Sequence, residues 1–271
     1  MITHIHWILP TIRVQALFYS FLCAFIVFSN NIRAQESNTK LDTLVSQSMH
    51  YFISESDSIN KIEEMIQDTF DEKKDTILGL AYCNIFLERG KKQEDYKIQY
   101  FSSFQMAYIY YFIPDYIQTI RYGNLSVKLA TKLQDTLQGI SSNTLLGNSL
   151  YVIGDYDESL KSYLAAKELS NLMKDSPYEI LCLTNIANTR LKLRQFKDAL
   201  KSFNTILTIV KEKDSATFPY YNETYLSAVL SKGLALSELG RVEEAEQVNN
   251  EGIQFSRAIK DKKHEGFFNI N

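Results

Sequence analysis

The chain has 271 residues, 29 basic and 32 acidic side chains and a formal net charge of −3. No basic stripe interleaved with aromatic residues is present, so direct nucleic-acid binding is not expected. Four prolines, ten glycines and 45% hydrophobic residues, without alternating β patterns, predict an almost purely helical protein.

The first 34 residues differ from the rest because they contain no acidic side chain and run apolar over residues 16–28. This run is too short to span a bilayer comfortably, and the bond between Ala34 and Gln35 fits a cleavage point. We expect residues 1–34 to be a signal peptide, and the mature protein to be periplasmic or secreted without a further membrane span. An uncleaved N-terminal anchor is the alternative, because Ile32 is not the small residue favoured before a cleavage site.

Residues 35–94 carry helical patterns that match no repeated unit. Apolar residues recur at helical spacing over residues 41–55, 59–70 and 76–89. We expect these helices to cap the N-terminal side of the domain that follows, with Gly90 ending the third of them.

From residue 95 onward, small and aromatic residues recur every forty positions. The recurring residues are Ala107, Gly147 and Ala187, and Tyr116, Tyr156 and Phe196. A fourth copy, centred on Gly233, follows after a longer interval. The pattern predicts four helix pairs, at about residues 95–132, 135–173, 176–213 and 223–259. Residues 260–271 form either a tail folded back over the last pair or a truncated next helix.

The clearest unit spans residues 146–169 and contains two helical patterns joined by the turn Gly154-Asp155. Its small residues are Gly147, Ser159 and Ala166, and its bulky ones are Leu146, Leu150, Tyr156 and Tyr163. Small side chains let two antiparallel helices approach closely, while bulky ones fill the space between them. This stretch resembles the tetratricopeptide repeat (TPR). The resemblance implies an all-α, right-handed superhelix of antiparallel helix pairs, an α–α solenoid.

In TPR proteins the first helices of successive repeats line a concave groove that accepts extended peptides or partner helices. The resemblance implies that nine residues occupy groove positions: Phe104, Tyr108, Tyr111, Thr144, Asn148, Tyr151, Thr184, Asn188 and Lys192. A fourth set, Leu230, Leu234 and Ser237, is mostly apolar. Amides suit the main chain of a peptide and rings suit its side chains. Packing of Tyr108 and Tyr111 against preceding helices is the alternative. Thr144 and Thr184 stand where chaperone-binding TPR proteins have lysine, so recognition of a free carboxylate terminus is not expected.

Catalytic and metal-binding patterns are missing from the sequence. No histidine of the mature chain stands at metal-ligand spacing from another histidine or cysteine, and no nucleophile elbow or glycine-rich phosphate loop is present. Asp155, Asp157 and Glu158 begin a helix, where acids cap free amides. Cys83 and Cys182 fall in different units and are expected to be buried free thiols. We therefore expect no enzyme, no cofactor and no metal site.

The leader, the forty-residue units and the runs 75–99 and 154–169 also resemble the exported TPR region of membrane-anchored bacterial regulators that carry an AraC-type helix-turn-helix domain. This resemblance implies an interaction module that binds a protein or peptide, as the sensor part of a signalling regulator. A structural scaffold for envelope proteins is the alternative. The sequence does not indicate an oligomeric state.

Overall fold

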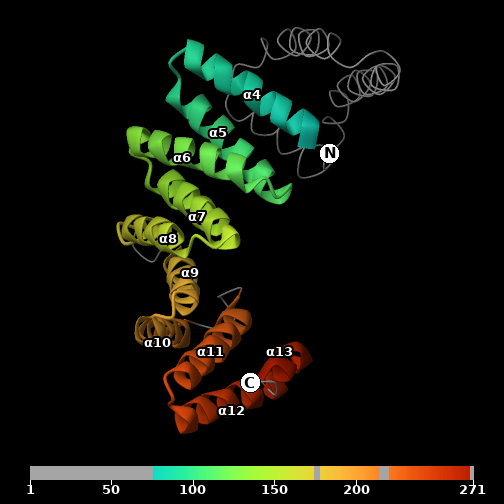
Figure 1. Ribbon diagram of the computed structural model, residues 1–271, viewed down its shortest axis with the longest axis vertical. Helices are drawn as coiled ribbons and strands as arrows, with labels where there is room; N and C mark the ends of the chain where they lie inside the picture. The colour runs from blue at the N-terminus through green and yellow to red at the C-terminus, as the bar shows by residue number, and fades with distance from the viewer. Residues whose placement is uncertain (1–75, 174–177, 214–219, 269–271) are drawn as a thin grey trace, which may run out of the picture. The chain divides into compact units, whose positions relative to one another are not determined.

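The computed structural model describes residues 76–173, 178–213 and 220–268, which lie within one compact unit, residues 62–271. The expected signal peptide, its cleavage point and the helices expected at 41–55 and 59–70 lie outside the described residues. Helix labels follow Figure 1 and begin at α4. The described helices are α4 (Thr76–Lys92), α5 (Tyr96–Phe112), α6 (Tyr116–Leu133), α7 (Thr136–Ile153), α8 (Tyr156–Ser170), α9 (Tyr178–Lys192), α10 (Phe196–Glu212), α11 (Tyr221–Glu238), α12 (Val242–Ala258) and α13 (Lys262–Phe268).

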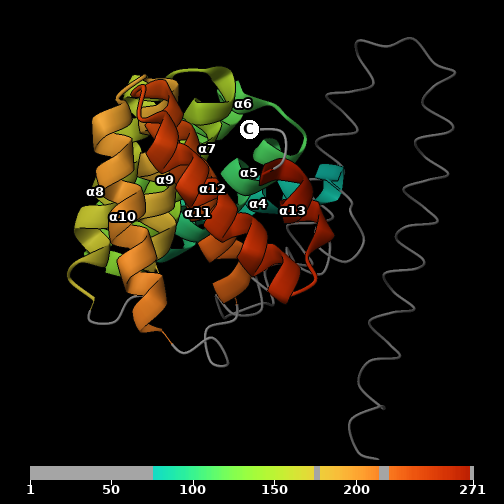
Figure 2. The same ribbon diagram turned by 90° about the horizontal axis from the view of Figure 1, so that it is seen from below.

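Each described helix packs against the next one along the chain (Figure 1). The pairs α5–α6, α7–α8, α9–α10 and α11–α12 occupy the four predicted units. The first helices of successive pairs also touch, from α5 to α7, α9 and α11. Figure 2 shows α13 beside α12, and α13 also contacts α11. The prediction of an all-α solenoid of antiparallel helix pairs is confirmed. Within the described residues, no helix is long and apolar enough to cross a membrane.

Aspartates spaced twenty residues apart begin four consecutive helices. Asp95, Asp115, Asp135 and Asp155 are the N-caps of α5 to α8, and each carboxylate accepts a hydrogen bond from a backbone N–H in the first turn. A cap of this kind satisfies an amide that has no partner inside the helix. The capping role predicted for Asp155 is confirmed.

Close contact inside the α7–α8 pair depends on Gly147, as the small-residue pattern predicts. A Cβ atom at this position would lie 2.6 Å from Cε1 of the buried Tyr163 ring. The Ser159 hydroxyl, which is fully buried, donates to the Gly147 carbonyl at 2.9 Å. Glycine and serine therefore bring the two backbones together, and Tyr163 fills the space beside them.

The prediction that Gly90 ends its helix is wrong, because α4 continues to Lys92. Gly90 is buried inside the helix where α5 crosses it, and a Cβ atom there would lie 3.0 Å from both Cγ and the backbone N of Gln99. The Gln99 side chain donates to the Gly90 carbonyl at 2.9 Å. This glycine serves the contact between two helices and not a helix end.

The described core consists of separate buried clusters, two of which extend from one helix pair into the next. One buried cluster joins α9, α10, α11, α12 and Phe268 of α13, whose ring packs on Gly252. A second cluster joins α7, α8 and α9 through Ile140, Ala166 and Cys182. Cys83 and Cys182 are both buried and free, as predicted.

Candidate functional site

Charge is distributed unequally between the two helices of each pair. Helix α7 carries no charged side chain and α5 carries one, Lys97, whereas α8, α10 and α12 carry five each. The second helices therefore present solvated charged faces. The first helices of the first two pairs, α5 and α7, present neutral polar and aromatic side chains. Two pockets lie along the first helices of the pairs.

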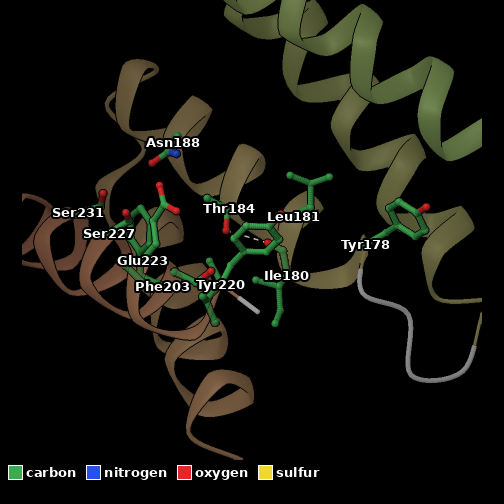
Figure 3. Close-up of a pocket in the computed structure, with 13 residues that line it drawn as sticks. Tyr178, Ile180, Leu181, Thr184, Asn188, Phe203, Tyr220, Glu223, Ser227 and Ser231 are labelled. Atoms are coloured by element: carbon green, nitrogen blue, oxygen red, sulfur yellow. Dashed lines mark hydrogen bonds between the residues drawn. The ribbon is translucent and has the colours of Figure 1, made fainter. Parts of the chain in front are cut away.

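The larger pocket has a volume of about 590 Å³ and lies between α9 and α11, with α10 beneath (Figure 3). Its lining residues are Tyr178, Ile180, Leu181, Thr184, Asn188, Phe203, Ile206, Tyr220, Glu223, Thr224, Ser227, Ala228 and Ser231. Figure 3 shows Asn188 on the same side as Glu223, Ser227 and Ser231, with Tyr178 at the opposite end. The pocket thus runs from an aromatic and aliphatic end to a polar end.

Polar groups in the larger pocket differ in what they can offer a ligand. The Thr184 hydroxyl donates to the Ile180 carbonyl at 2.8 Å, so its oxygen is left to accept. Glu223 is the one carboxylate among the lining residues, and its side chain is exposed. This pocket can hold a large apolar side chain and place a cation beside Glu223.

The smaller pocket has a volume of about 180 Å³ and lies where α5, α7, α8 and α9 approach one another. Its lining residues are Tyr111, Asn148, Tyr151, Val152, Tyr163, Asn185 and Asn188. Asn188 is shared with the larger pocket, so the two pockets adjoin. None of the seven side chains is an acid, a lysine, an arginine or a histidine.

One hydrogen bond organises the smaller pocket. The Tyr163 hydroxyl donates to Oδ1 of Asn148 at 2.7 Å, which fixes the Asn148 amide. The phenols of Tyr163 and Tyr151 are both neutral at physiological pH, and burial raises the pKa of each further above the ordinary value. The side chains of Tyr111, Tyr151, Asn185 and Asn188 make no hydrogen bond within the described part of the chain. Four neutral hydrogen-bonding groups therefore face a ligand-sized space.

The two pockets bring together five of the nine groove positions implied by the TPR resemblance. Four of them line the smaller pocket: Tyr111, Asn148, Tyr151 and Asn188. Thr184 joins Asn188 in the larger pocket. The fourth set of groove positions on α11 lines neither pocket. Leu230 packs on the core, and Leu234 and Ser237 are exposed.

The remaining four groove positions line neither pocket. Phe104 stacks on Tyr100 with ring centroids 5.9 Å apart and belongs to the α5–α6 core cluster. Tyr108 packs edge-on against Phe112 at 4.8 Å. Thr144 has a buried hydroxyl without a hydrogen-bond partner, and Lys192 is exposed. Helical spacing alone did not separate ligand-facing from core-facing aromatics in α5.

Most of the lining residues were not among the predicted groove positions, and three of them matter for the chemistry of the pockets: Asn185, Tyr163 and Glu223. Asn185 precedes Asn188 by one turn, and this spacing puts the two amides on one helix face. Tyr163 was expected only as a filler between α7 and α8. Glu223 opens α11, and the sequence gives no signal that its side chain reaches a pocket.

The comparisons with known proteins agree with this geometry. Residues 140–212, which cover most of α7 and all of α8 to α10, match the tetratricopeptide repeat family. No curated protein matches the chain.

Several solved structures share the fold. The chain is similar to BtubC (BKLC) from P. vanneervenii, with a TM-score of 0.66 and 11% identity over 83% of this chain and 91% of that one. It is similar to a Rap protein complexed with Competence and Sporulation Factor, with a TM-score of 0.52 and 18% identity over 73% of this chain and 54% of that one. The chain is also similar to aspartyl phosphate phosphatase F from Bacillus subtilis, with a TM-score of 0.55 and 13% identity over 95% of this chain and 74% of that one. At these identities the likeness concerns the fold alone. The helix pairs, their recurring small residues and the family match together show that residues 140–212 carry tetratricopeptide repeats, within a chain that has a TPR-like solenoid fold.

Proposed function

We propose that the chain is an exported, non-enzymatic interaction module that binds an extended peptide, or an extended segment of a partner protein, along α7, α9 and α11. The observation that carries this proposal is the pair of adjoining pockets that share Asn188. One pocket is neutral and polar and the other is largely apolar. A continuous peptide would place successive side chains in both.

Asparagine is suited to hold the main chain of such a peptide. Asn148 and Asn188 stand at equivalent positions of α7 and α9, forty residues apart. A carboxamide both donates and accepts, so it can pair with a peptide N–H and a C=O. The Rap structure contains a bound factor by its own description, which supports ligand binding by this fold.

Binding without catalysis is supported by the chemistry of the lining residues. General acid–base or nucleophilic catalysis needs a reactive group with a positioned partner. Glu223 has no histidine, cysteine or lysine beside it in the lining of either pocket. Within the described residues, no group of three or more potential metal ligands is present. The phosphatase among the similar structures shares the fold at 13% identity and lends no activity to this chain.

Selection of peptides on the immobilised protein, followed by titration calorimetry, tests the proposal. A phage-displayed random heptapeptide library serves as the probe. We expect an enriched peptide to bind Asn188→Ala at least tenfold more weakly than the wild type, which corresponds to about 1.4 kcal/mol. Asn204→Ala, an exposed asparagine on α10, is the matched control and should bind as the wild type does. Wild-type affinity of Asn188→Ala would place the binding site elsewhere.

Asn148 is a poorer test position than Asn188. Its replacement by alanine would leave the buried Tyr163 hydroxyl without its partner, and a loss of binding could then reflect a loss of stability. Asn188 makes no side-chain hydrogen bond in the described part of the chain, so its truncation breaks no hydrogen bond within the protein.

Export is the second part of the proposal, and residues 1–34 support it by their composition. N-terminal sequencing of the exported protein should begin at Gln35. A membrane-bound product that still begins at Met1 would contradict cleavage. The resemblance to exported TPR regions of regulators supports a role as the sensor part of a signalling protein. A reading frame that continues past Asn271 into a membrane span and a helix-turn-helix domain would support that role.

A further inference from the structure

The smaller pocket offers hydrogen-bonding groups that the protein itself does not use. The side chains of Asn185, Asn188, Tyr111 and Tyr151 make no hydrogen bond in the described residues, and the Asn148 amide nitrogen makes none either. These groups include both donors and acceptors. A ligand group in this pocket must therefore satisfy both kinds at once.

Charge is excluded from the smaller pocket by its lining. None of its seven residues carries a charge, because each is an asparagine, a valine or a tyrosine, and a tyrosine phenol is neutral at physiological pH. A lysine, arginine or carboxylate entering it would lose water without gaining a counter-charge, which is costly. An aliphatic side chain would leave the amides unpaired, which is costly as well.

The volume decides between the neutral polar side chains. The pocket volume is about 180 Å³, whereas one water molecule occupies about 30 Å³ in the liquid. The pocket can therefore hold a group of several heavy atoms. A serine hydroxyl would leave most of it to water. A carboxamide of asparagine or glutamine supplies two donors and an oxygen acceptor in one plane.

The adjoining pocket fixes where the next recognised side chain lies. The larger pocket shares Asn188 and is lined by Ile180, Leu181 and Phe203, so it accepts a large aliphatic or aromatic side chain. An extended peptide advances about 3.3 Å per residue. Neighbouring pockets with a common wall are therefore reached by side chains about two to four residues apart.

We propose, resting on the function proposed above, that the protein is specific for peptides that place an asparagine or glutamine side chain in the smaller pocket and a large apolar side chain, two to four residues away, in the larger one. The carboxamide pairs with Asn185 and Asn188 and with the phenols of Tyr111 and Tyr151. Specificity at this position is set by the neutrality of the pocket.

Selections from the random heptapeptide library on three proteins test this specificity. On the wild type, sequencing should show asparagine or glutamine enriched two to four positions from a large apolar residue. Asn185→Asp has nearly the same shape but adds a carboxylate, so the enriched residue at that position should change to lysine or arginine. Asn204→Asp adds the same charge on the exposed face of α10 and should select as the wild type does. Circular dichroism during heating confirms that each variant is folded.

The outcomes separate this inference from the proposed function. Enriched peptides without an amide preference, or a preference unchanged in Asn185→Asp, would overturn the specificity and leave peptide binding in place. Displacement of the selected peptide by a neutral oligosaccharide such as maltoheptaose would assign the pocket to a carbohydrate and overturn the inference. No enrichment on the wild type would overturn both proposals.

Discussion

Single residues in α7 serve packing and the candidate site at the same time. Gly147 admits the Tyr163 ring, and the hydroxyl of that ring holds the Asn148 amide at 2.7 Å. The position of a pocket amide thus depends on the absence of a side chain one residue earlier. At this scale, stability and binding geometry rest on the same contact.

Gly147→Leu should overpack this contact and destabilise the protein by about 1–3 kcal/mol or more. The reason is that the Tyr163 ring already stands 2.6 Å from where a Cβ atom would be. Gly123→Ala in α6 is the control, because its Cβ atom would meet Leu146 at an ordinary 3.6 Å. Relief of the glycine penalty within a helix should make that variant as stable as the wild type or up to about 1 kcal/mol more stable. Chemical denaturation measures both, and an unchanged midpoint for Gly147→Leu would mean that the α7–α8 contact is wrong.

At the scale of the helix, the residue that caps the N-terminus differs between the earlier and the later helices. Four helices begin at an aspartate cap, whereas Gln195 precedes α10 without a side-chain cap hydrogen bond. Gln195 stands forty residues after Asp155, at the equivalent turn of the next pair. The second helix of the third pair therefore lacks the side-chain cap that begins the second helices of the first two pairs.

Gln195→Asp should restore the missing cap and raise the free energy of unfolding by about 0.5–1 kcal/mol. The carboxylate would reach the free amides of the first turn of α10, which already contains Asp198. Urea denaturation measures the gain. Asp135→Ala, which removes an existing cap from α7, should cost about 0.5–2 kcal/mol. A loss of stability in Gln195→Asp would show that this turn cannot accept the cap geometry.

Helices and their pairing could be predicted from the sequence because small and aromatic residues recur at one interval. The contact of Gly147 with Tyr163 follows directly from that pattern. Gly90 was misread because glycine marks helix ends and close helix crossings alike, and only the position of Gln99 distinguishes them. The twenty-residue spacing of the capping aspartates was present in the sequence and would have given the helix starts.

The candidate site was predictable only in part, for a physical reason. The repeat register indicates which helix face carries groove positions, and four of the residues that it indicates, Tyr111, Asn148, Tyr151 and Asn188, line one pocket. It could not show that the Phe104 ring would turn to Tyr100 instead. Side-chain packing between neighbouring helices decides that, and no periodicity encodes it. The pockets and their shared wall came from the structure.

At the scale of the whole molecule, buried thiols and phenols predict a loss of stability at alkaline pH. Burial raises the pKa of Cys182 from 9.0 to about 11, and burial raises the pKa of Tyr100 to about 12. Between the unfolded and folded pKa values the folded state holds more protons, so stability is complete below about pH 9 and falls as pH rises toward 11. One such group lowers the free energy of unfolding by at most about 1.4 kcal/mol per pH unit.

Cys182→Ala isolates this contribution. The slope of unfolding free energy against pH, measured by denaturation from pH 8 to pH 11, should become shallower in the variant. Its absolute stability is not the readout, because the truncation also leaves a small cavity in the cluster with Ile140 and Ala166. An identical slope in both proteins would show that the thiol ionises in the folded protein as freely as in water.

The central claim is that an extended peptide lies along the first helices of the pairs and crosses α9. Site-specific photo-crosslinking tests this claim most directly. p-Benzoylphenylalanine replaces either Leu181, which lines the larger pocket and is 44% exposed, or Leu164 on α8, which is 41% exposed and lines neither pocket. With the selected heptapeptide bound, irradiation should attach it at position 181 and not at position 164. Attachment at position 164 alone, or equal attachment at both, would contradict the claim.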